Sequence, residues 1–262
     1  MSASKPCVIV GKGRIGQALV EMGPGGDVLV GREGGIPATP EGPIVVCTRN
    51  DVLDEVVKRT PESRRKDLLF VQNGMLQPWM DANGLGSNTQ ALIFFAVSKL
   101  GEKPKDGKTD LNPEGLTAVT GPHAQAFADR LAAGGLSCKV LSEIDYKKAM
   151  LEKLVWISAI MLVGAEHQCL VGDVESKHTE QVSGLFAELA EGGAAELGVT
   201  LDDGTVARLL AYSRSVAHFP TAVKEFEWRN GWFWKISERE MAAGNADPFP
   251  THSKMLKAQG VI

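Results

Sequence analysis

The first half of the chain alternates short apolar runs with amphipathic segments. The runs have the length of buried strands, and the amphipathic segments repeat apolar residues at helical spacing. The expected strands lie at residues 7–10, 28–30, 44–47, 68–71, 91–97, 116–119 and 138–141. The expected helices lie at residues 15–22, 52–58 and 121–131. Strands that alternate with helices predict an α/β fold with a doubly wound, mostly parallel sheet.

Two segments of this half interrupt the alternation. The stretch between Arg32 and Ile44 is rich in Gly and Pro, so we expect the connection there to lack a full helix. Residues 101–115 carry many Lys, Asp, Gly and Pro residues and predict an exposed loop.

After about residue 144 the strand-like runs end and long helical patterns follow. The expected helices lie at residues 146–166, 179–197, 204–216 and 221–243, with Asp202 and Asp203 placed to cap the third. This change predicts two domains, residues 1–144 and an all-helical 145–262, with a cleft between them. No internal repeat is evident.

Composition narrows the function. The chain has 262 residues, with 28 basic and 32 acidic side chains and a net charge of −4, and it has no basic stripe, which argues against nucleic acid as a partner. The longest apolar stretch, residues 154–165, is too short to cross a bilayer, and no signal-peptide pattern opens the chain. The four cysteines have neither metal-ligand spacing nor a disulfide pattern. We expect a cytoplasmic protein with reduced thiols, no metal site and no membrane contact.

A glycine-rich turn follows the first strand. Gly11, Lys12, Gly13, Arg14, Ile15 and Gly16 form the sequence GKGRIG, which leads from an apolar run into an amphipathic helix. In such a turn the first glycine permits the bend, the second lets a pyrophosphate approach the backbone, and the third lets helix and strand pack closely. The helix N-terminus then offers N–H groups to the phosphates. The motif predicts a dinucleotide site, although an ordinary βα turn can share the pattern.

The end of the second strand indicates which dinucleotide binds. An acidic residue there accepts hydrogen bonds from a ribose 2′-hydroxyl, whereas an arginine pairs with a 2′-phosphate. This chain has Arg32 at that place, with Lys12 and Arg14 in the phosphate turn. The pattern favours NADP over NAD. In the alternative, Glu33 binds the ribose and Arg32 is a solvated surface charge.

The order of these and later motifs resembles the ketopantoate reductases, within the wider set of 6-phosphogluconate-dehydrogenase-like reductases. The matching segments are Gly11 to Gly16, Gly31-Arg32, Gln72-Asn73-Gly74-Met75, Lys153-Leu154-Val155, and residues 224–231, which align with a family motif T-E-I-D-x-x-N-G. The resemblance covers nearly the whole chain. It implies a Rossmann-type N-terminal domain that binds NADP and a helical C-terminal domain that binds the substrate; related helical domains often form homodimers.

The resemblance also implies a catalytic group. Hydride transfer to a ketone puts negative charge on the carbonyl oxygen, and Lys153 matches the family lysine that would supply a proton there. Glu225 falls on the family's active-site glutamate, which holds a substrate hydroxyl. The alternatives are a solvated lysine on a helix face and a helix-surface glutamate paired with Arg229.

Three further positions match more weakly. Asn73 would face the nicotinamide or the substrate, although Asn-Gly is also a favoured turn dipeptide. Arg49 lies where relatives often carry a lysine near the cofactor, and a surface arginine is the alternative. Ser213 matches a family serine that contacts the substrate by spacing alone, and Thr221 competes with it.

Two departures from the family pattern limit the substrate. The family helix carries asparagines four and eight residues after its lysine, whereas this chain has Ile157 and Met161. Without those amides a polar hydroxy acid loses hydrogen-bond partners, so we expect a substrate other than ketopantoate. The second departure is an aromatic cluster at residues 228–234, which forms core, a subunit contact or a more apolar substrate pocket.

The sequence therefore predicts an NADPH-dependent reductase of a small carbonyl compound, most simply a 2-oxo acid. One alternative is an NADPH-binding sensor or assembly protein without catalysis. Another is a protein that binds S-adenosylmethionine, which the third glycine and the basic residue at the strand end argue against.

Overall fold

The computed structural model describes residues 5–262 and divides into two compact units. The α/β unit comprises residues 5–108 and Asn112–Tyr146, and the helical unit comprises Thr109–Leu111 and Lys147–Ile262. Within the described part of the chain, none of the helices has the length and apolar character needed to cross a membrane.

The α/β unit is built on one sheet of seven strands. They are β1 (Val8–Val10), β2 (Val28–Val30), β3 (Ile44–Val46), β4 (Leu68–Phe70), β5 (Thr89–Leu92), β6 (Ala118–Thr120) and β7 (Lys139–Val140), in the order β2-β1-β3-β4-β5-β6-β7. Neighbouring strands are parallel except β5 and β6. The predicted mostly parallel sheet is confirmed. The chain reverses its winding direction between β1 and β3, and a ligand of such a sheet binds at the carboxyl ends of these strands.

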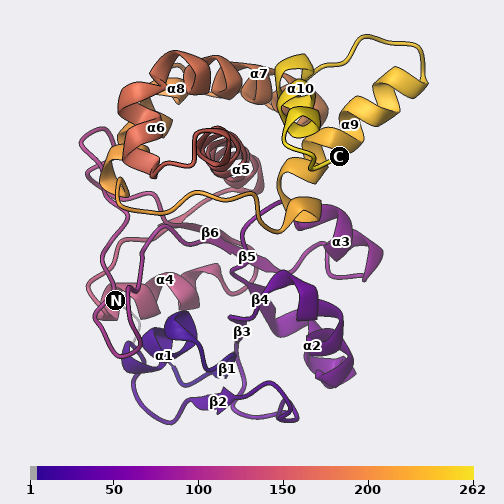
Figure 1. Ribbon diagram of the computed structural model, residues 1–262. Helices are drawn as coiled ribbons and strands as arrows, with labels where there is room; N and C mark the ends of the chain where they lie inside the picture. The colour runs from indigo at the N-terminus through magenta and orange to yellow at the C-terminus, as the bar shows by residue number, and fades with distance from the viewer. Residues whose placement is uncertain (1–4) are drawn as a thin grey trace. The chain divides into compact units, whose positions relative to one another are not determined.

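Helices cover both faces of this sheet (Figure 1). One face packs Ile9, Val45 and Leu69 against α1 (Arg14–Glu21) and α4 (Ala124–Ala133) in a single apolar core. The other face carries the alternate strand residues, and Phe70 there contacts Trp79 of α3 (Gln77–Ala82) edge to face. α2 (Leu53–Arg59) lies on the same side as α3. Because strand residues alternate between faces, burial on both sides explains why β1, β3 and β4 are wholly apolar.

A buried ion pair ties this unit together. Arg130 of α4 donates from Nη1 and Nη2 to the two carboxylate oxygens of Asp27, over 2.7 and 2.8 Å, and Asp27 also accepts from the Cys7 N–H. Both side chains are nearly inaccessible to solvent. This bidentate pair fixes α4 against the starts of β1 and β2.

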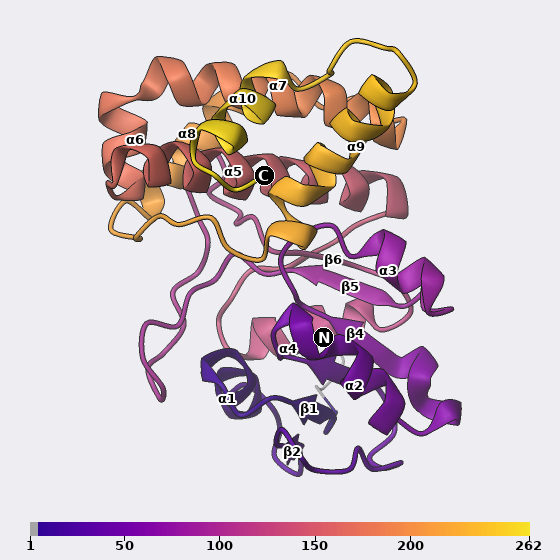
Figure 2. The same ribbon diagram turned by 45° about the vertical axis from the view of Figure 1, so that its right-hand side comes forward.

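The helical unit is arranged around α5 (Glu143–His167). Figure 1 looks along α5 and shows other helices around it, and Figure 2 shows it from the side. From Leu151 to Val163 nearly every residue of α5 is buried, as expected for a helix at the centre of a core. The remaining helices are α6 (Val171–Lys177), α7 (Thr179–Leu197), α8 (Thr205–Ser215), the short 3₁₀ helix η3 (Phe226–Trp228), α9 (Asn230–Ala242) and α10 (Pro250–Ala258).

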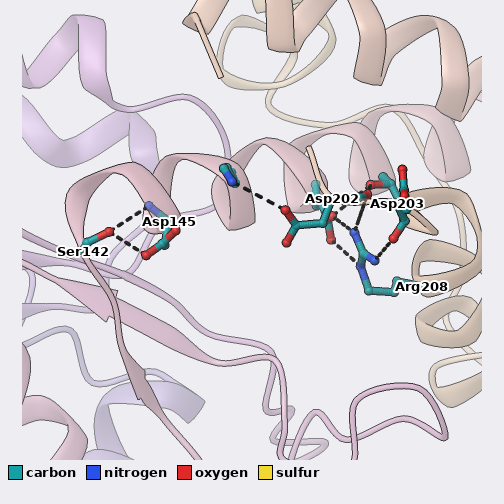
Figure 3. Close-up of polar contacts among 8 residues, drawn as sticks. Ser142, Asp145, Asp202, Asp203 and Arg208 are labelled. Carbon is teal, nitrogen blue, oxygen red and sulfur yellow. Dashed lines mark hydrogen bonds and ion pairs between the residues drawn. The ribbon is translucent and has the colours of Figure 1, made fainter. Parts of the chain in front are cut away.

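Polar contacts fix the beginnings of α5 and α8 (Figure 3). At α5 the Ser142 hydroxyl accepts from the Asp145 N–H and donates to the Asp145 carboxylate, a local cap. At α8 the prediction of an aspartate cap is wrong, because Gly204 is the capping residue and no side chain caps the helix. Arg208 instead donates to the carbonyl oxygens of Asp203 and Asp202, over 2.6 and 3.2 Å.

The largest error of sequence interpretation concerns residues 221–243. This stretch is not one helix: residues 221–224 have no regular secondary structure, η3 follows, and α9 begins only at Asn230. Glu225 has a left-handed backbone (φ 49°), which interrupts a right-handed helix. Gly231 lies so close to η3 that an added Cβ would be 2.6 Å from the Phe226 carbonyl oxygen. The turn therefore depends on glycine at residue 231.

Smaller differences occur elsewhere. The expected strand at 91–97 is β5 at Thr89–Leu92, shifted toward the N-terminus, and the short helices α3, α6 and α10 were not predicted. The predicted absence of a helix between Arg32 and Ile44 is confirmed, since β2 and β3 follow one another directly in the described chain.

Candidate functional site

The glycine-rich turn has the geometry of a phosphate-binding turn. Gly11 follows β1 with φ 118°, and a Cβ there would lie 2.7 Å from the Cys47 carbonyl oxygen. A Cβ on Gly16 would lie 1.9 Å from the Gly11 carbonyl oxygen, so α1 packs on the turn only with glycine at this position. Nothing lies within 4 Å of a Cβ built on Gly13. The turn is therefore tight where the fold needs it and open where a pyrophosphate would approach.

The start of α1 suits an anion. Gly13 is its N-cap, and no side chain from residues 5–262 makes a capping hydrogen bond at this end of the helix. The free N–H groups and the positive end of the helix dipole therefore face the open side of the turn. Ile15, in the first turn of α1, is half-buried and packs against the apolar core that contains Ile9, Val45 and Leu69. These features fit the phosphates of a dinucleotide.

Two basic residues lie at the end of β2, where the adenosine ribose binds in this type of sheet. The Lys12 side chain extends over Gly31, with Nζ 3.7 Å from the place of a Gly31 Cβ. Arg32 is the next residue, is exposed, and forms no ion pair with any residue of 5–262. Lys12 and Arg32 therefore place two positive charges at this end of β2.

Arg14, in the same turn, binds backbone carbonyl oxygens. Its Nη1 donates to the carbonyl oxygens of Val97 and Ser98, over 3.0 and 2.9 Å. The guanidinium therefore fixes the segment after β5 to the start of α1. In this conformation Arg14 contributes to the shape of the turn.

Polar groups also gather where β3 and β4 end. Gln72 donates from Nε2 to the Val46 and Thr48 carbonyl oxygens, and buried Asn50 donates to the Asn73 carbonyl oxygen over 3.1 Å. Two buried oxygens, Thr48 Oγ1 and Gln72 Oε1, have no hydrogen-bond partner among residues 5–262. Because buried polar atoms are normally satisfied, these oxygens indicate a place for a ligand donor or water.

The two predicted residues at this edge differ in environment. Asn73 is half-buried in the turn after β4, and its backbone is held by Asn50. Arg49 is largely exposed and pairs with Asp51 over 2.7 Å, in line with the surface-arginine alternative. Asn73 is therefore the better placed of the two to contact a cofactor.

In the helical unit, Lys153 is a buried lysine. It lies on α5 with 7% of its surface exposed. Burial and, to a smaller extent, the positive charge of Arg229 lower the pKa of Lys153 to about 7. The solvated-lysine alternative is excluded for this residue. A lysine with a pKa near neutrality can donate a proton at physiological pH, which is the property a general acid requires.

Glu225 and Arg229 form an ion pair at the turn before α9. Glu225 Oε2 accepts from Arg229 Nη2, and the two side chains are 30% and 11% exposed. The sequence spacing had suggested this pair on a helix surface, but residues 225–229 are not an α-helix and the pair is largely buried. Burial lowers the pKa of Arg229, whereas Glu225 acts in the opposite direction.

An apolar stripe of α5 continues from Lys153. Ile157 and Met161 follow at four-residue spacing and so share its side of the helix, and Ile157 is 7% exposed. The segment before Glu225 runs along the same helix, because a Cβ on Gly164 would lie 2.3 Å from Thr221. At that end an open pocket of about 640 Å³ is lined by apolar residues such as Ala165, Pro220 and Val223 together with the polar Gln168, Asp173 and Gln259. The Ile157 and Met161 side chains themselves offer no hydrogen-bond donor to a polar substrate.

The predicted substrate contact at Ser213 does not suit its position. Ser213 is fully buried in α8, donates to the Leu209 carbonyl oxygen and accepts from Trp156 Nε1. Its hydroxyl is thus used within the helical core, and we leave Ser213 out of the proposed site. Thr221, the competing residue, donates to the Cys169 carbonyl oxygen over 2.5 Å.

Comparison with known proteins gives matches in structure. No protein-family model matches the sequence, and no curated protein matches it. A dimeric ketopantoate reductase from Staphylococcus aureus is 16% identical, with a TM-score of 0.69 over 97% of this chain and 98% of that chain. A ketopantoate reductase from Ralstonia eutropha JMP134 is 16% identical, with a TM-score of 0.67 over 96% and 97%.

A third similar structure is D-mandelate dehydrogenase with NADH and anilino(oxo)acetate. It is 15% identical, with a TM-score of 0.66 over 97% of this chain and 98% of that chain. At these identities the likeness establishes the fold. The chain therefore has the fold of the ketopantoate reductases, a Rossmann-type sheet followed by a helical unit, as its ordered motifs predict.

Proposed function

We propose that this protein is an NADPH-dependent reductase of a small 2-oxo acid other than ketopantoate. The observation that carries the proposal is Lys153, a buried lysine with a pKa of about 7 on the helix where the resemblance expects a proton donor. The fold is shared with ketopantoate reductases and with a D-mandelate dehydrogenase that binds NADH. Those proteins act on or bind small oxo or hydroxy acids, and the residues below support the same class here.

The α/β unit would hold the cofactor, which supplies the hydride when bound. The N-terminus of α1, beside the open space at Gly13, would bind the pyrophosphate. Lys12 and Arg32 would bind the 2′-phosphate, which is the basis for proposing NADPH in preference to NADH. Asn73, half-buried after β4, would contact the nicotinamide.

Lys153 would supply the proton. As a carbonyl is reduced, negative charge develops on its oxygen, and a nearby ammonium stabilises that charge and then donates. Because burial disfavours the charged form of Lys153, its proton is held weakly enough for transfer near neutral pH. Glu225 would position the substrate through its contact with Arg229.

Ile157 and Met161 support a substrate other than ketopantoate. Each replaces a family amide and shares the Lys153 side of α5. A buried substrate hydroxyl without a partner costs about 1–3 kcal/mol, so these side chains would discriminate against ketopantoate and favour an apolar substituent.

The proposal is tested by NADPH oxidation over a panel of 2-oxo acids. We expect turnover with apolar 2-oxo acids, a rate that falls as the pH rises through about 7, and loss of turnover in Lys153→Met. Lys254→Met, which removes an exposed lysine from α10 of the same unit, is the matched control. Full activity of Lys153→Met would refute the proton-donor role.

The same apolar residues favour one alternative, an NADPH-binding sensor or assembly protein without catalysis. It predicts tight NADPH binding and no turnover on the whole panel.

A further inference from the structure

Arg229 is a buried cation with hydrogen-bonding capacity left over. The residue is 9% exposed, and its Nη2 pairs with Glu225 Oε2. Its Nε lies in the buried part of the side chain and has no partner among residues 5–262. A guanidinium N–H taken out of water without an acceptor is costly, so a bound ligand that offers an acceptor gains from this position.

The chemistry of the guanidinium points to a carboxylate. Nε carries one N–H, and the adjacent Nη2 carries two, so Nη2 can serve Glu225 and a ligand together. Two parallel N–H donors match the two oxygens of a carboxylate, and charge makes these hydrogen bonds strong. Glu225 holds the guanidinium through Nη2, and its own backbone is held at the beginning of η3 by the hydrogen bond from the Trp228 N–H.

The place of Arg229 beside the proposed proton donor selects the ligand. The charge of Arg229 acts on Lys153, so the two cations are close within the helical unit. In a 2-oxo acid the carboxylate is bonded directly to the carbonyl carbon. One molecule can therefore present its carbonyl oxygen to Lys153 and its carboxylate to Arg229, with its substituent toward the apolar stripe at Ile157 and Met161.

We propose that Arg229 is the carboxylate anchor of the substrate site, and that Glu225 is the positioning residue that holds it. This inference rests on the proposed function and names the residue that would bind the carboxylate of its 2-oxo acid, which disfavours an ester, an amide or a simple ketone. In the family motif T-E-I-D-x-x-N-G, Arg229 occupies an unassigned position, so the anchor is a property of this chain.

The test compares phenylglyoxylate with its methyl ester, which lacks the negative charge. Binding of each to the full protein saturated with NADP⁺ is measured by calorimetry, which needs no turnover. We expect the wild-type protein to bind the acid at least tenfold more tightly than the ester. Arg229→Met should abolish this preference with little effect on the ester, and Arg229→Lys, which keeps the charge without the fork, should give an intermediate preference.

Several results would overturn the anchor. They are an unchanged acid-to-ester ratio in Arg229→Met, equal loss of both ligands in Arg229→Met and Arg229→Lys, and a wild-type protein that does not prefer the acid. Failure of the proposed function is distinguishable, because it appears as absent NADPH oxidation whatever the acid-to-ester ratio. Conversely, Lys153-dependent turnover with no acid preference would leave the reductase in place and remove the anchor.

Discussion

Replacing Lys153 by methionine should stabilise the folded protein at neutral pH. The substitution keeps an unbranched side chain of similar length and removes a charge from a position that is 7% exposed. Folding lowers the pKa of this lysine from 10.5 to about 7. Lys153 therefore binds its proton more tightly in the unfolded chain than in the folded chain. At any pH at which the unfolded lysine is protonated, folding must either remove this proton or bury the charged ammonium, and both lower the stability of the wild-type protein.

The size and the pH dependence follow from this shift. One unit of pKa corresponds to about 1.4 kcal/mol, so the lysine costs on the order of 4 kcal/mol at about pH 7 and about 2 kcal/mol at about pH 9. Because folding lowers the pKa of the lysine, the loss of unfolding free energy is greatest below the folded pKa. It disappears as the pH rises past the unfolded pKa. Stability of the wild-type protein should thus rise relative to Lys153→Met between about pH 7 and about pH 10.

Urea denaturation of both proteins at several pH values measures this difference. Other groups, including the cysteines of the unfolded chain, titrate in the same range, but they are common to both proteins, so the difference in unfolding free energy isolates Lys153. Lys254→Met should show no such pH dependence, because Lys254 is exposed. Parallel stability curves for wild type and Lys153→Met would refute the lowered pKa, and with it the physical basis of the proton-donor role.

Three further predictions concern the α/β unit. Gly13→Ala should leave stability unchanged but weaken NADPH binding, because its Cβ enters open space beside α1. Gly16→Ala should instead destabilise the fold, because its Cβ would be 1.9 Å from the Gly11 carbonyl oxygen. Thermal melts measure the change in stability, and NADPH fluorescence measures the change in binding. Arg32→Ala should weaken NADPH binding about tenfold to a hundredfold and leave NADH binding unchanged, and equal affinity of the wild-type protein for both would remove this role. Arg130→Met should lower the unfolding free energy by about 3–5 kcal/mol, since it strands buried Asp27, and a measured loss under about 1 kcal/mol in urea denaturation would contradict the buried pair.

The α/β unit was the easier half to predict from sequence. Apolar runs bounded by turn residues predict strands that are covered on both faces. The phosphate-binding turn requires glycine at fixed spacing, a pattern that few other turns share. The space around each glycine agrees with its expected structural role: a Cβ would clash at Gly11 and Gly16 and would meet no atom within 4 Å at Gly13. Arg14 shows the limit: sequence reveals a cation in the turn, but its bonds to the Val97 and Ser98 carbonyl oxygens depend on a segment more than eighty residues away.

The helical unit was harder because its periodicity hides breaks. The spacing of Glu225 and Arg229 fits a helix, yet a left-handed residue and a close contact at Gly231 interrupt it, and neither leaves a strong signal in the pattern. The same spacing did identify the pair as partners. The sequence did not reveal that this pair is largely buried. Burial leaves Arg229 Nε without a partner among residues 5–262, and the charge of Arg229 lowers the pKa of Lys153.

The central claim is that this protein reduces a 2-oxo acid with NADPH and a proton from Lys153. Its most direct measurement is the rate of NADPH oxidation with the best acid of the panel, for wild type and Lys153→Met, as a function of pH. The account predicts a wild-type rate that declines above about pH 7 and a loss of about a hundredfold or more in the variant. Tight NADPH binding without turnover of any acid, or a variant as fast as the wild type, would contradict it.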